Sequence, residues 1–121
     1  MQLKEASRCF CIPNEILQLY AQNGLLKAAT AQGEPDYPEE EIKRAGYFWS
    51  LQKAGMDLDT LKRFAALLDS TADTCAQQIK ILQKCRYALL EEIHAKQQSL
   101  DQLDYLIYTL KNPNTKGGAI P

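Results

Sequence analysis

The chain has 121 residues, of which 45% are hydrophobic and 24% charged, and its formal net charge at pH 7 is −1. This length is that of one domain, and the composition excludes a disordered chain, a collagen-like repeat and a disulfide-rich scaffold. No apolar run approaches the ~20 residues that span a bilayer, and residues 1–8 are too polar for a signal peptide. We therefore expect a cytoplasmic protein without a membrane partner, in which any affinity for nucleic acid comes from local patches of charge.

The N-terminal residues predict two short helices separated by a turn. Residues 3–9 form the first, and residues 14–22 form the second, with Pro13 at a position that the first turn of a helix tolerates. Asn23 and Gly24 then end the second helix with residues suited to a left-handed cap. Two short helices joined by a tight turn are the outline of a helix-turn-helix.

The next segment is irregular and is followed by two further helices. Residues 27–37 are rich in small and turn-forming residues, which predicts a short β-ribbon or a loop. Pro38 and the acidic residues after it mark a helix start, because acidic side chains interact favourably with the dipole in the first turn. Gly55 ends this helix, and Asp57 suits the N-cap of another that runs to about Leu68.

Residues 72–111 contain neither glycine nor proline, and apolar residues recur in them with a seven-residue period. This pattern is typical of a coiled coil. At 1.5 Å per residue the helix would be about 60 Å long, which is too long for so small a domain to cover. We expect a second copy of the chain to cover the apolar seam. The predicted seam residues are Ile79, Leu82, Leu89, Ile93, Leu100, Leu103, Ile107 and Leu110, with Arg86 and Lys96 as the two interruptions.

Several groups of residues occur in a recognisable order between residues 3 and 111. They are Leu3-Lys4-Glu5-Ala6-Ser7 and Ile12-Pro13; Leu17-Gln18-Leu19-Tyr20 and Gly24-Leu25-Leu26; Tyr37 with Glu41-Ile42; Leu51, Ala54-Gly55-Met56-Asp57-Leu58 and Leu61-Lys62; and Leu89-Leu90-Glu91-Glu92-Ile93-His94 with Leu100-Asp101-Gln102-Leu103-Asp104-Tyr105. The order and spacing of these groups resemble those of the MerR family of bacterial transcription regulators. The chain resembles a short form of the family, without a C-terminal effector domain.

The resemblance implies an all-α fold in three parts. Residues 1–70 would form a winged helix-turn-helix DNA-binding domain with a small β wing, and residues 71–111 one long antiparallel coiled-coil dimerisation helix. Residues 112–121, with their Asn-Pro and Gly-Gly pairs, are expected to form a disordered tail. The seam cations Arg86 and Lys96 would pair with Glu91, Glu92 or Asp101 of the partner helix and specify its register.

The function implied is that of a homodimer which binds a pseudo-palindromic element of double-stranded promoter DNA and controls transcription by distorting it, with RNA polymerase as a further partner. Amide side chains can pair with adenine, although a solvated helix face is the alternative interpretation. Tyr20 could contact a phosphate or pack between the first two helices, and the basic residues are candidates for phosphate contacts. The predicted DNA-binding residues are Asn14, Gln18, Tyr20, Lys43, Arg44, Lys53 and Arg63.

A concentration of acidic residues favours an alternative function. The family's arginine in the recognition helix corresponds to Gln18, and its two wing arginines correspond to about Thr30 and Asp36. Phosphate neutralisation supplies much of the affinity for DNA, so the alternative is a MerR-like dimeric protein-interaction module with weak or lost DNA binding. Residues 28–42 contain no basic residue and five acidic ones, which are Glu34, Asp36, Glu39, Glu40 and Glu41.

The histidine and the cysteines, the other residues with chemically reactive side chains, do not predict a catalytic, cofactor or metal site. The single histidine, His94, lies beside the seam, and no nucleophile–base pair or glycine-rich phosphate loop is present. Cys9 and Cys11 could hold a soft metal, but burial as small apolar side chains is the favoured interpretation. Cys85 lies off the seam and could be a reactive thiol. We therefore expect a protein that is not an enzyme.

Overall fold

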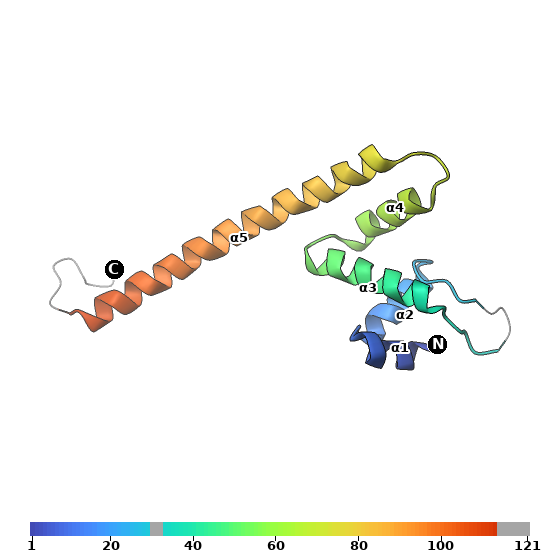
Figure 1. Ribbon diagram of the computed structural model, residues 1–121. Helices are drawn as coiled ribbons and strands as arrows, with labels where there is room; N and C mark the ends of the chain where they lie inside the picture. Colours follow the sequence, from blue (N-terminus) through green and yellow to red (C-terminus); the bar gives the residue numbers. More distant parts are fainter. Residues whose placement is uncertain (30–32, 114–121) are drawn as a thin grey trace. The chain divides into compact units, whose positions relative to one another are not determined.

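The computed structural model of the protein describes residues 1–29 and 33–113, and every regular element in these ranges is an α-helix (Figure 1). The predicted all-α class is confirmed for this part of the chain. The chain divides into two compact units, Met1–Cys85 and Arg86–Pro121, and the division lies within the last helix. The domain limits expected from the sequence remain predictions. The helices are α1 (Leu3–Phe10), α2 (Asn14–Gln22), α3 (Glu39–Lys53), α4 (Leu58–Asp69) and α5 (Cys75–Lys111).

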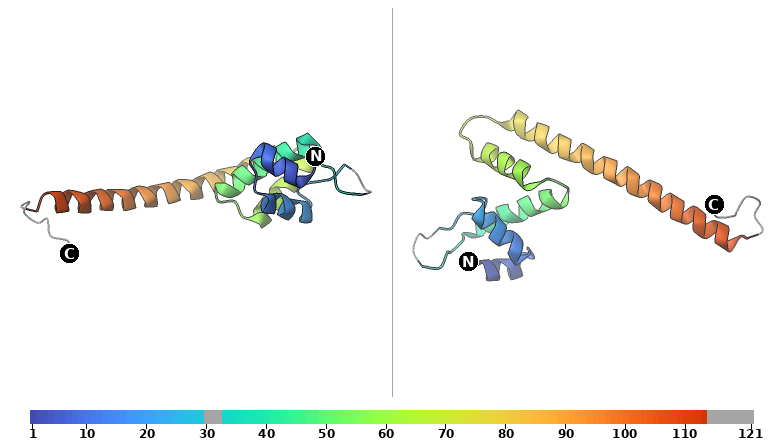
Figure 2. Two further views of the ribbon diagram at one scale, coloured as in Figure 1. Left: turned by 90° about the horizontal axis from the view of Figure 1, so that it is seen from below. Right: turned by 180° about the vertical axis from the view of Figure 1, so that it is seen from behind.

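Helices α1 and α2 are joined by a tight turn, as the sequence predicts (Figure 2). Helix α1 ends at Cys11, whose backbone has a left-handed conformation with φ 56°. Pro13 follows in an extended conformation, and its carbonyl accepts hydrogen bonds from the first turn of α2. At the other end of α2, Gly24 adopts φ 74°, a value that glycine reaches without steric cost. The predicted start and stop of α2 are both confirmed.

Helices α3 and α4 begin at the residues that the sequence indicates. Pro38 precedes α3, and the acidic residues Glu39, Glu40 and Glu41 occupy its first turn. Asp57 is the N-cap of α4, and its Oδ1 accepts a hydrogen bond from the backbone N–H of Thr60 at 2.7 Å. This cap satisfies one of the N–H groups that the first turn of a helix leaves without a partner.

The unit Met1–Cys85 has one hydrophobic core, to which all of its helices contribute. The rings of Tyr20 from α2 and Phe48 from α3 meet edge to face, with centroids 6.3 Å apart. The first turns of α5 complete the core with the half-buried side chains of Ile81, Leu82 and Cys85. The largest fully buried side chains are Tyr20, Phe48, Phe64, Leu17, Ile42 and Leu61.

The segment between α2 and α3 contains no strand in its described residues, 23–29 and 33–38. Its two arms are joined by a hydrogen bond of 2.7 Å from the backbone N–H of Ala29 to the carbonyl of Asp36. A backbone pair between Met1 and Tyr37 fixes the end of the second arm. The predicted β-ribbon is therefore replaced here by a loop, the other form that the sequence allows, while Thr30 lies outside the described residues.

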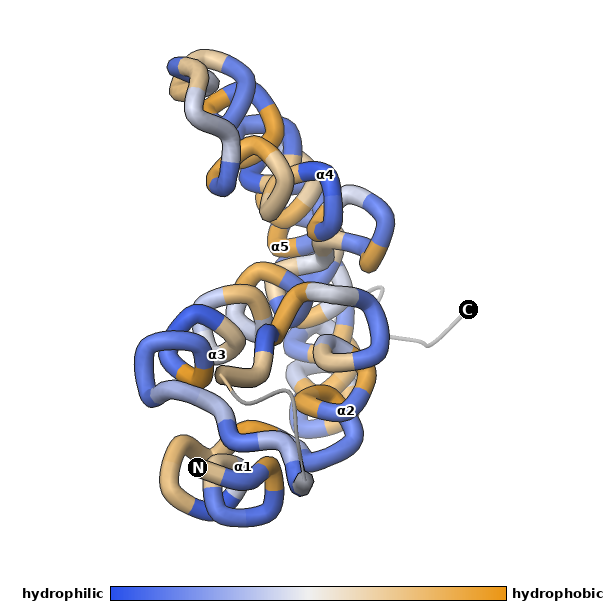
Figure 3. The backbone as a smooth tube through the Cα atoms, turned by 90° about the vertical axis from the view of Figure 1, so that its right-hand side faces the viewer, coloured by the Kyte–Doolittle hydropathy of each residue, from blue (hydrophilic) through white to orange (hydrophobic). Residues whose placement is uncertain are grey.

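Helix α5 is continuous over Cys75–Lys111, as predicted for residues 72–111. Hydrophobic and hydrophilic residues alternate along it in short stretches (Figure 3). Asn112 follows the helix and donates from its backbone N–H to the carbonyl of Tyr108 at 3.0 Å. Most of the predicted tail, residues 114–121, lies outside the described residues. None of the described helices is long and apolar enough to cross a membrane.

Candidate nucleic-acid interface

Helix α2 presents a polar face opposite its buried one. Leu17 and Tyr20 point into the core, whereas Glu15, Gln18 and Gln22 are exposed. Their spacing of three and four residues places these three side chains on one side of the helix. Gln18 is thus available for contact, as the sequence predicts. Gln22 was missed, although the same helical spacing from Gln18 would have identified it.

Asn14 and Tyr20 are less accessible than Gln18. Asn14 is half-buried at the start of α2, and its Oδ1 is enclosed without a hydrogen-bond partner among the described residues. Tyr20 is fully buried, and its hydroxyl donates a hydrogen bond to Oε1 of Gln52 in α3. Burial raises the pKa of Tyr20 to about 12. This environment favours the packing interpretation of Tyr20 over a phosphate contact.

Three of the predicted basic residues are exposed on α3 and α4. Lys43 lies one turn after Glu39, with its Nζ 3.7 Å from the carboxylate oxygen. Such an exposed pair is weak, so Lys43 can exchange its partner for a phosphate. Lys53 lies with its Nζ 5.6 Å from the ring centre of Trp49, and Arg63 donates to Oγ1 of Thr60 at 3.2 Å.

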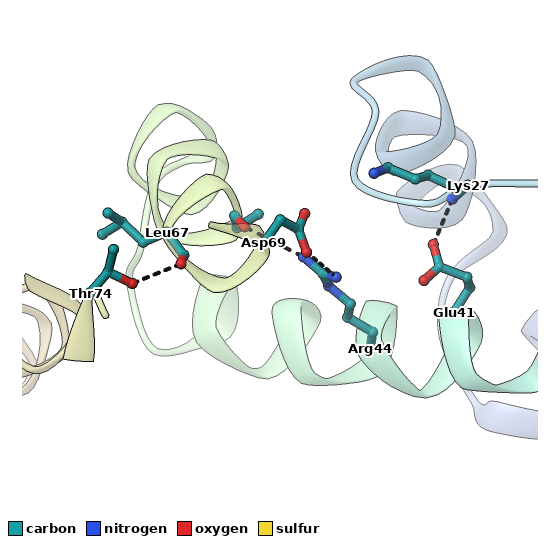
Figure 4. Close-up of polar contacts among 7 residues, drawn as sticks. Lys27, Glu41, Arg44, Leu67, Asp69 and Thr74 are labelled. Atoms are coloured by element: carbon teal, nitrogen blue, oxygen red, sulfur yellow. Dashed lines mark hydrogen bonds and ion pairs between the residues drawn. The ribbon is translucent and has the colours of Figure 1, made fainter. Parts of the chain in front are cut away.

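Arg44 differs from the other basic residues because it already joins two helices. Its Nη1 lies 2.7 Å from Oδ1 of Asp69 at the end of α4, and Nη2 lies 3.5 Å from the carbonyl of Ala65 (Figure 4). Its guanidinium also lies 5.2 Å from the ring centre of Phe48. The hydrogen bond from Arg44 lowers the pKa of Asp69. Arg44 is therefore a structural contact first, and a phosphate would have to compete with Asp69 for it.

The acidic residues around the loop are directed toward groups of the chain itself. The terminal amino group of Met1 forms an ion pair with Asp36, and the side-chain amide of Gln2 donates to Glu34. Glu41 accepts a hydrogen bond of 2.8 Å from the backbone N–H of Lys27 (Figure 4). The ion pair with Met1 offsets part of the negative charge that the sequence places here, and the other two contacts orient their carboxylates. The role of residues 1 and 2 in holding the loop was not foreseen, since the pairing spans more than thirty positions.

All four cysteines are free thiols, and none of them is fully buried. Cys9 and Cys11 are both exposed, so the burial favoured for them from the sequence is wrong. Cys11 occupies the left-handed turn after α1, where its side chain is exposed. In the described part of the chain no three His, Cys, Asp or Glu residues lie close enough to hold a metal ion.

The predicted seam residues of α5 are largely exposed in the single chain. Leu82 and Leu89 are half-buried, and the other six are exposed. Within the unit Arg86–Pro121, a shallow open groove is lined by Leu89, Ile93, Lys96 and Leu100 among others. Contiguous apolar surface of this kind is uncommon on a protein that acts alone.

Comparison with known proteins relates the chain to one fold. No family model and no curated protein matches the sequence. A solved structure from Listeria monocytogenes, assigned to the MerR family of transcriptional regulators, has a TM-score of 0.77 at 23% identity, covering 95% of this chain and 86% of that one. A second solved structure is that of HiNmlR, a MerR family regulator that lacks the sensor domain, bound to promoter DNA. It has a TM-score of 0.80 at 20% identity, and the match covers 100% of this chain and 96% of that one. The chain therefore has the fold of MerR family regulators.

Proposed function

We propose that this chain is a DNA-binding transcription regulator that acts as a homodimer on a pseudo-palindromic promoter element. The observation that carries the proposal is the exposed amide face of α2, the second helix of a helix-turn-helix, in a chain that shares its fold with a regulator bound to promoter DNA. The expected place of action is the cytoplasm, where the promoter and RNA polymerase are.

Base recognition is assigned to α2. The side chains of Gln18 and Gln22 are exposed, and the helix behind them is anchored by the buried Leu17 and Tyr20. An amide can donate and accept together, and it can therefore pair with the major-groove edge of adenine. Because the helix is anchored in the core, little backbone entropy is lost when it binds DNA.

Phosphate contacts are assigned to Lys43, Lys53 and Arg63. All three are exposed, and the contacts that they make within the chain are weak enough to be replaced. The loop after α2 would lie near the backbone as the wing. The terminal amino group of Met1 pairs with Asp36 and reduces its repulsion of phosphate, whereas the neutral amide of Gln2 orients Glu34 and leaves its charge in place. Distortion of the promoter would then let few base contacts control transcription.

A protein-interaction module with lost DNA binding is the second candidate, and the first turn of α3 favours it. Glu39 and Glu40 are exposed there, and the segment 33–42 contains no basic residue. Like charges near a phosphate backbone reduce association, and the effect is strongest at low salt. The two candidates therefore differ in one measurable property, the affinity of the folded protein for DNA.

Fluorescence anisotropy of the protein titrated against its own upstream DNA tests the proposal. We expect binding that weakens steeply between low and moderate salt. Gln18→Ala should reduce the preference for this DNA over an unrelated duplex by about tenfold or more, because one base contact is worth about 1–3 kcal/mol. Lys43→Gln and Arg63→Gln should weaken binding to both duplexes and lower the salt dependence by about one unit each.

Lys84→Gln is the matched control, since it removes the same charge from an exposed position on α5. It should leave the affinity and its salt dependence unchanged. If the folded protein binds neither duplex at either salt concentration, the regulator is excluded and the protein-interaction module is favoured.

A further inference from the structure

The loop between α2 and α3 leaves the hydrophobic core at Lys27. Leu25 and Leu26 directly before it are buried, whereas Lys27 and residues 28–29 after it are exposed. The position of the first arm of this loop therefore depends on what holds the backbone at Lys27, where the buried part of the chain ends.

Glu41 in the first turn of α3 holds that backbone. Its Oε1 accepts a hydrogen bond of 2.8 Å from the N–H of Lys27 (Figure 4). Glu41 is half-buried and the neighbouring Ile42 is fully buried, so the carboxylate is carried by a part of α3 that the core fixes. Two residues further along the loop, the N–H of Ala29 donates to the carbonyl of Asp36 in the second arm. The contact with Glu41 thus fixes the start of the arm that this pairing joins to the second one.

The other two acidic residues of this turn make no such contact with the loop. Glu39 pairs with Lys43 one turn later on the same helix, at 3.7 Å. Glu40 is exposed, and its side chain forms no hydrogen bond or ion pair within the described part of the chain. Glu40 and Glu41 are therefore adjacent residues of the same charge, and they differ in whether they hold the loop.

The side chain of Lys27 is the basic group that this backbone carries. Between Arg8 and Lys43 the sequence contains no other basic residue. The amino group of Lys27 is exposed and forms no ion pair with any described residue. The pKa of Asp69 is lowered mainly by the hydrogen bond from Arg44 and to a smaller extent by the charge of Lys27, which places this amino group near the end of α4. Any cationic contact from the base of the loop to a phosphate must therefore come from Lys27.

We propose that Glu41 is a positioning residue for DNA binding: it holds the backbone of Lys27 so that the Lys27 amino group contacts a DNA phosphate at the base of the loop. The proposal rests on the DNA-binding function proposed above, and it adds one phosphate contact and the residue that orients it. Lys27 follows α2 by only a few residues, so the contact belongs next to the helix assigned to base recognition. A contact of this kind positions a protein on the duplex without reading a base.

The positioning role predicts an effect opposite in sign to that of charge alone. A negative side chain near the phosphate backbone repels it, so removal of an acidic residue ordinarily strengthens DNA binding. Removal of Glu41 should weaken binding instead, because the contact of Lys27 with a phosphate is lost. The repulsion that is relieved acts over a longer distance and is screened by salt, so it does not compensate for that loss.

Fluorescence anisotropy of full-chain variants with the upstream duplex, at low and moderate salt, tests this sign. Lys27→Gln should weaken binding about fivefold, the upper end for an exposed charge pair, and lower the salt dependence by about one unit. Glu41→Ala should weaken binding by a similar factor and lower the salt dependence in the same way, although it removes a negative charge. Glu40→Ala is the matched control, because it removes the same charge from the same turn of α3. It should leave binding unchanged or strengthen it.

Glu41→Gln separates the hydrogen bond from the charge. Its amide oxygen can still accept from the N–H of Lys27, so this variant should bind DNA at least as tightly as the unmodified chain. The variant also tests a route through Arg44, whose pKa is raised first by the hydrogen bond with Asp69 and to a smaller extent by the charge of Glu41. If Glu41 acted through that charge, Glu41→Gln would weaken binding as much as Glu41→Ala. Adding Glu41→Ala to Lys27→Gln should cause no further loss, since both changes remove one contact.

Amide hydrogen exchange in the absence of DNA checks the hydrogen bond itself. The amide of Lys27 should exchange faster in Glu41→Ala than in the unmodified chain and stay protected in Glu41→Gln. Circular dichroism shows whether each variant is folded at the temperature of the titration. Lys27→Gln changes only an exposed side chain, so it tests the phosphate contact even if Glu41→Ala is unstable.

The outcomes separate the positioning role from the DNA-binding function. If Glu41→Ala strengthens binding as Glu40→Ala does, or weakens it further in the Lys27→Gln background, the positioning role is overturned. Binding that does not change in Lys27→Gln overturns the phosphate contact and leaves the regulator in place. Absence of binding by the folded, unmodified chain overturns the DNA-binding function and this inference with it.

Discussion

The Tyr20 hydroxyl donates a hydrogen bond to Gln52 from a ring that is fully buried between α2 and α3. This contact ties the helix assigned to base recognition to the helix that carries Lys43 and Lys53. Its value to the protein is positional, since movement of Tyr20 would move Gln18 on the opposite face of α2. The packing of the Tyr20 ring thus helps to fix the position of Gln18, which the ring does not contact.

Tyr20→Phe should lower the free energy of unfolding by about 1 kcal/mol, because it leaves the amide oxygen of Gln52 without its partner. Chemical denaturation at neutral pH measures this difference. The affinity for DNA should change little, since the ring and the helix stay in place. A large loss of affinity from an equally folded variant would instead assign the hydroxyl to DNA.

The raised pKa of Tyr20 predicts that the stability of the folded chain decreases at alkaline pH. The pKa of Tyr20 is about 12 in the folded chain, above the ordinary value of 10.0. The folded state thus holds this proton more tightly, so its contribution to stability is complete below pH 10 and decreases as the pH rises toward 12. Thermal unfolding between pH 9 and 11 should show this decrease in the unmodified chain, and Tyr20→Phe should reduce it.

Asp57 is a second residue whose ionisation matters to a helix. The hydrogen bond from the backbone of Thr60 lowers the pKa of Asp57, so the charged form is favoured in the folded chain. Its contribution is present above the pKa of the unfolded state and is lost as the pH falls through the folded one. Asp57→Ala should lower the melting temperature at neutral pH, whereas Asp57→Asn should retain most of the cap.

At the scale of the elements, the Arg44–Asp69 pair holds the end of α4 against α3. Both side chains are partly exposed, at 30% and 43%, so solvent weakens their attraction. Thr74 adds a second contact at this end of α4, donating from its hydroxyl to the carbonyl of Leu67 at 2.8 Å (Figure 4). Polar contacts therefore hold the end of α4, in addition to the hydrophobic core to which α4 and the first turns of α5 both contribute.

A double-mutant cycle with Arg44→Gln and Asp69→Asn should give a coupling energy of no more than about 1 kcal/mol, as is usual for partly exposed pairs. The pKa of Asp69 is lowered by Arg44, so this coupling should be present at neutral pH and disappear as acid protonates the carboxyl group. Arg44→Gln should also reduce DNA affinity less than Lys43→Gln. An equal loss from the two variants would mean that Asp69 releases Arg44 to a phosphate.

At the scale of the whole molecule, stability and function should both depend on protein concentration. Six of the eight predicted seam residues of α5 are exposed in the single chain, and association stabilises a protein that binds its partner only when folded. We expect the melting temperature to rise by several degrees per tenfold increase in concentration. Leu103→Glu should remove this dependence and DNA binding together, while the unit Met1–Cys85 keeps its helices. Retained binding by a monomeric variant would contradict the homodimer.

The sequence alone determined the helices, the place of their ends and the seven-residue pattern of α5. These features depend on neighbours along the chain: Pro13 and Asp57 act on the helix turn beside them, and a heptad repeats within one helix. The exposed position of Gln18 on the second helix followed from the same local reasoning. The MerR-like order of the segments also came from the sequence, and the fold agrees with it.

Tertiary structure alone decided the surroundings of individual side chains. In the folded chain Tyr20 is buried and Arg44 is hydrogen-bonded to Asp69. Cys9 is exposed, and the acidic loop is paired with Met1. Each of these outcomes depends on which helices meet and at what angle, and the residues involved lie far apart in the sequence or outside regular helix. A helix boundary is set by a few adjacent backbone groups, whereas the environment of a side chain is set by packing over the whole unit.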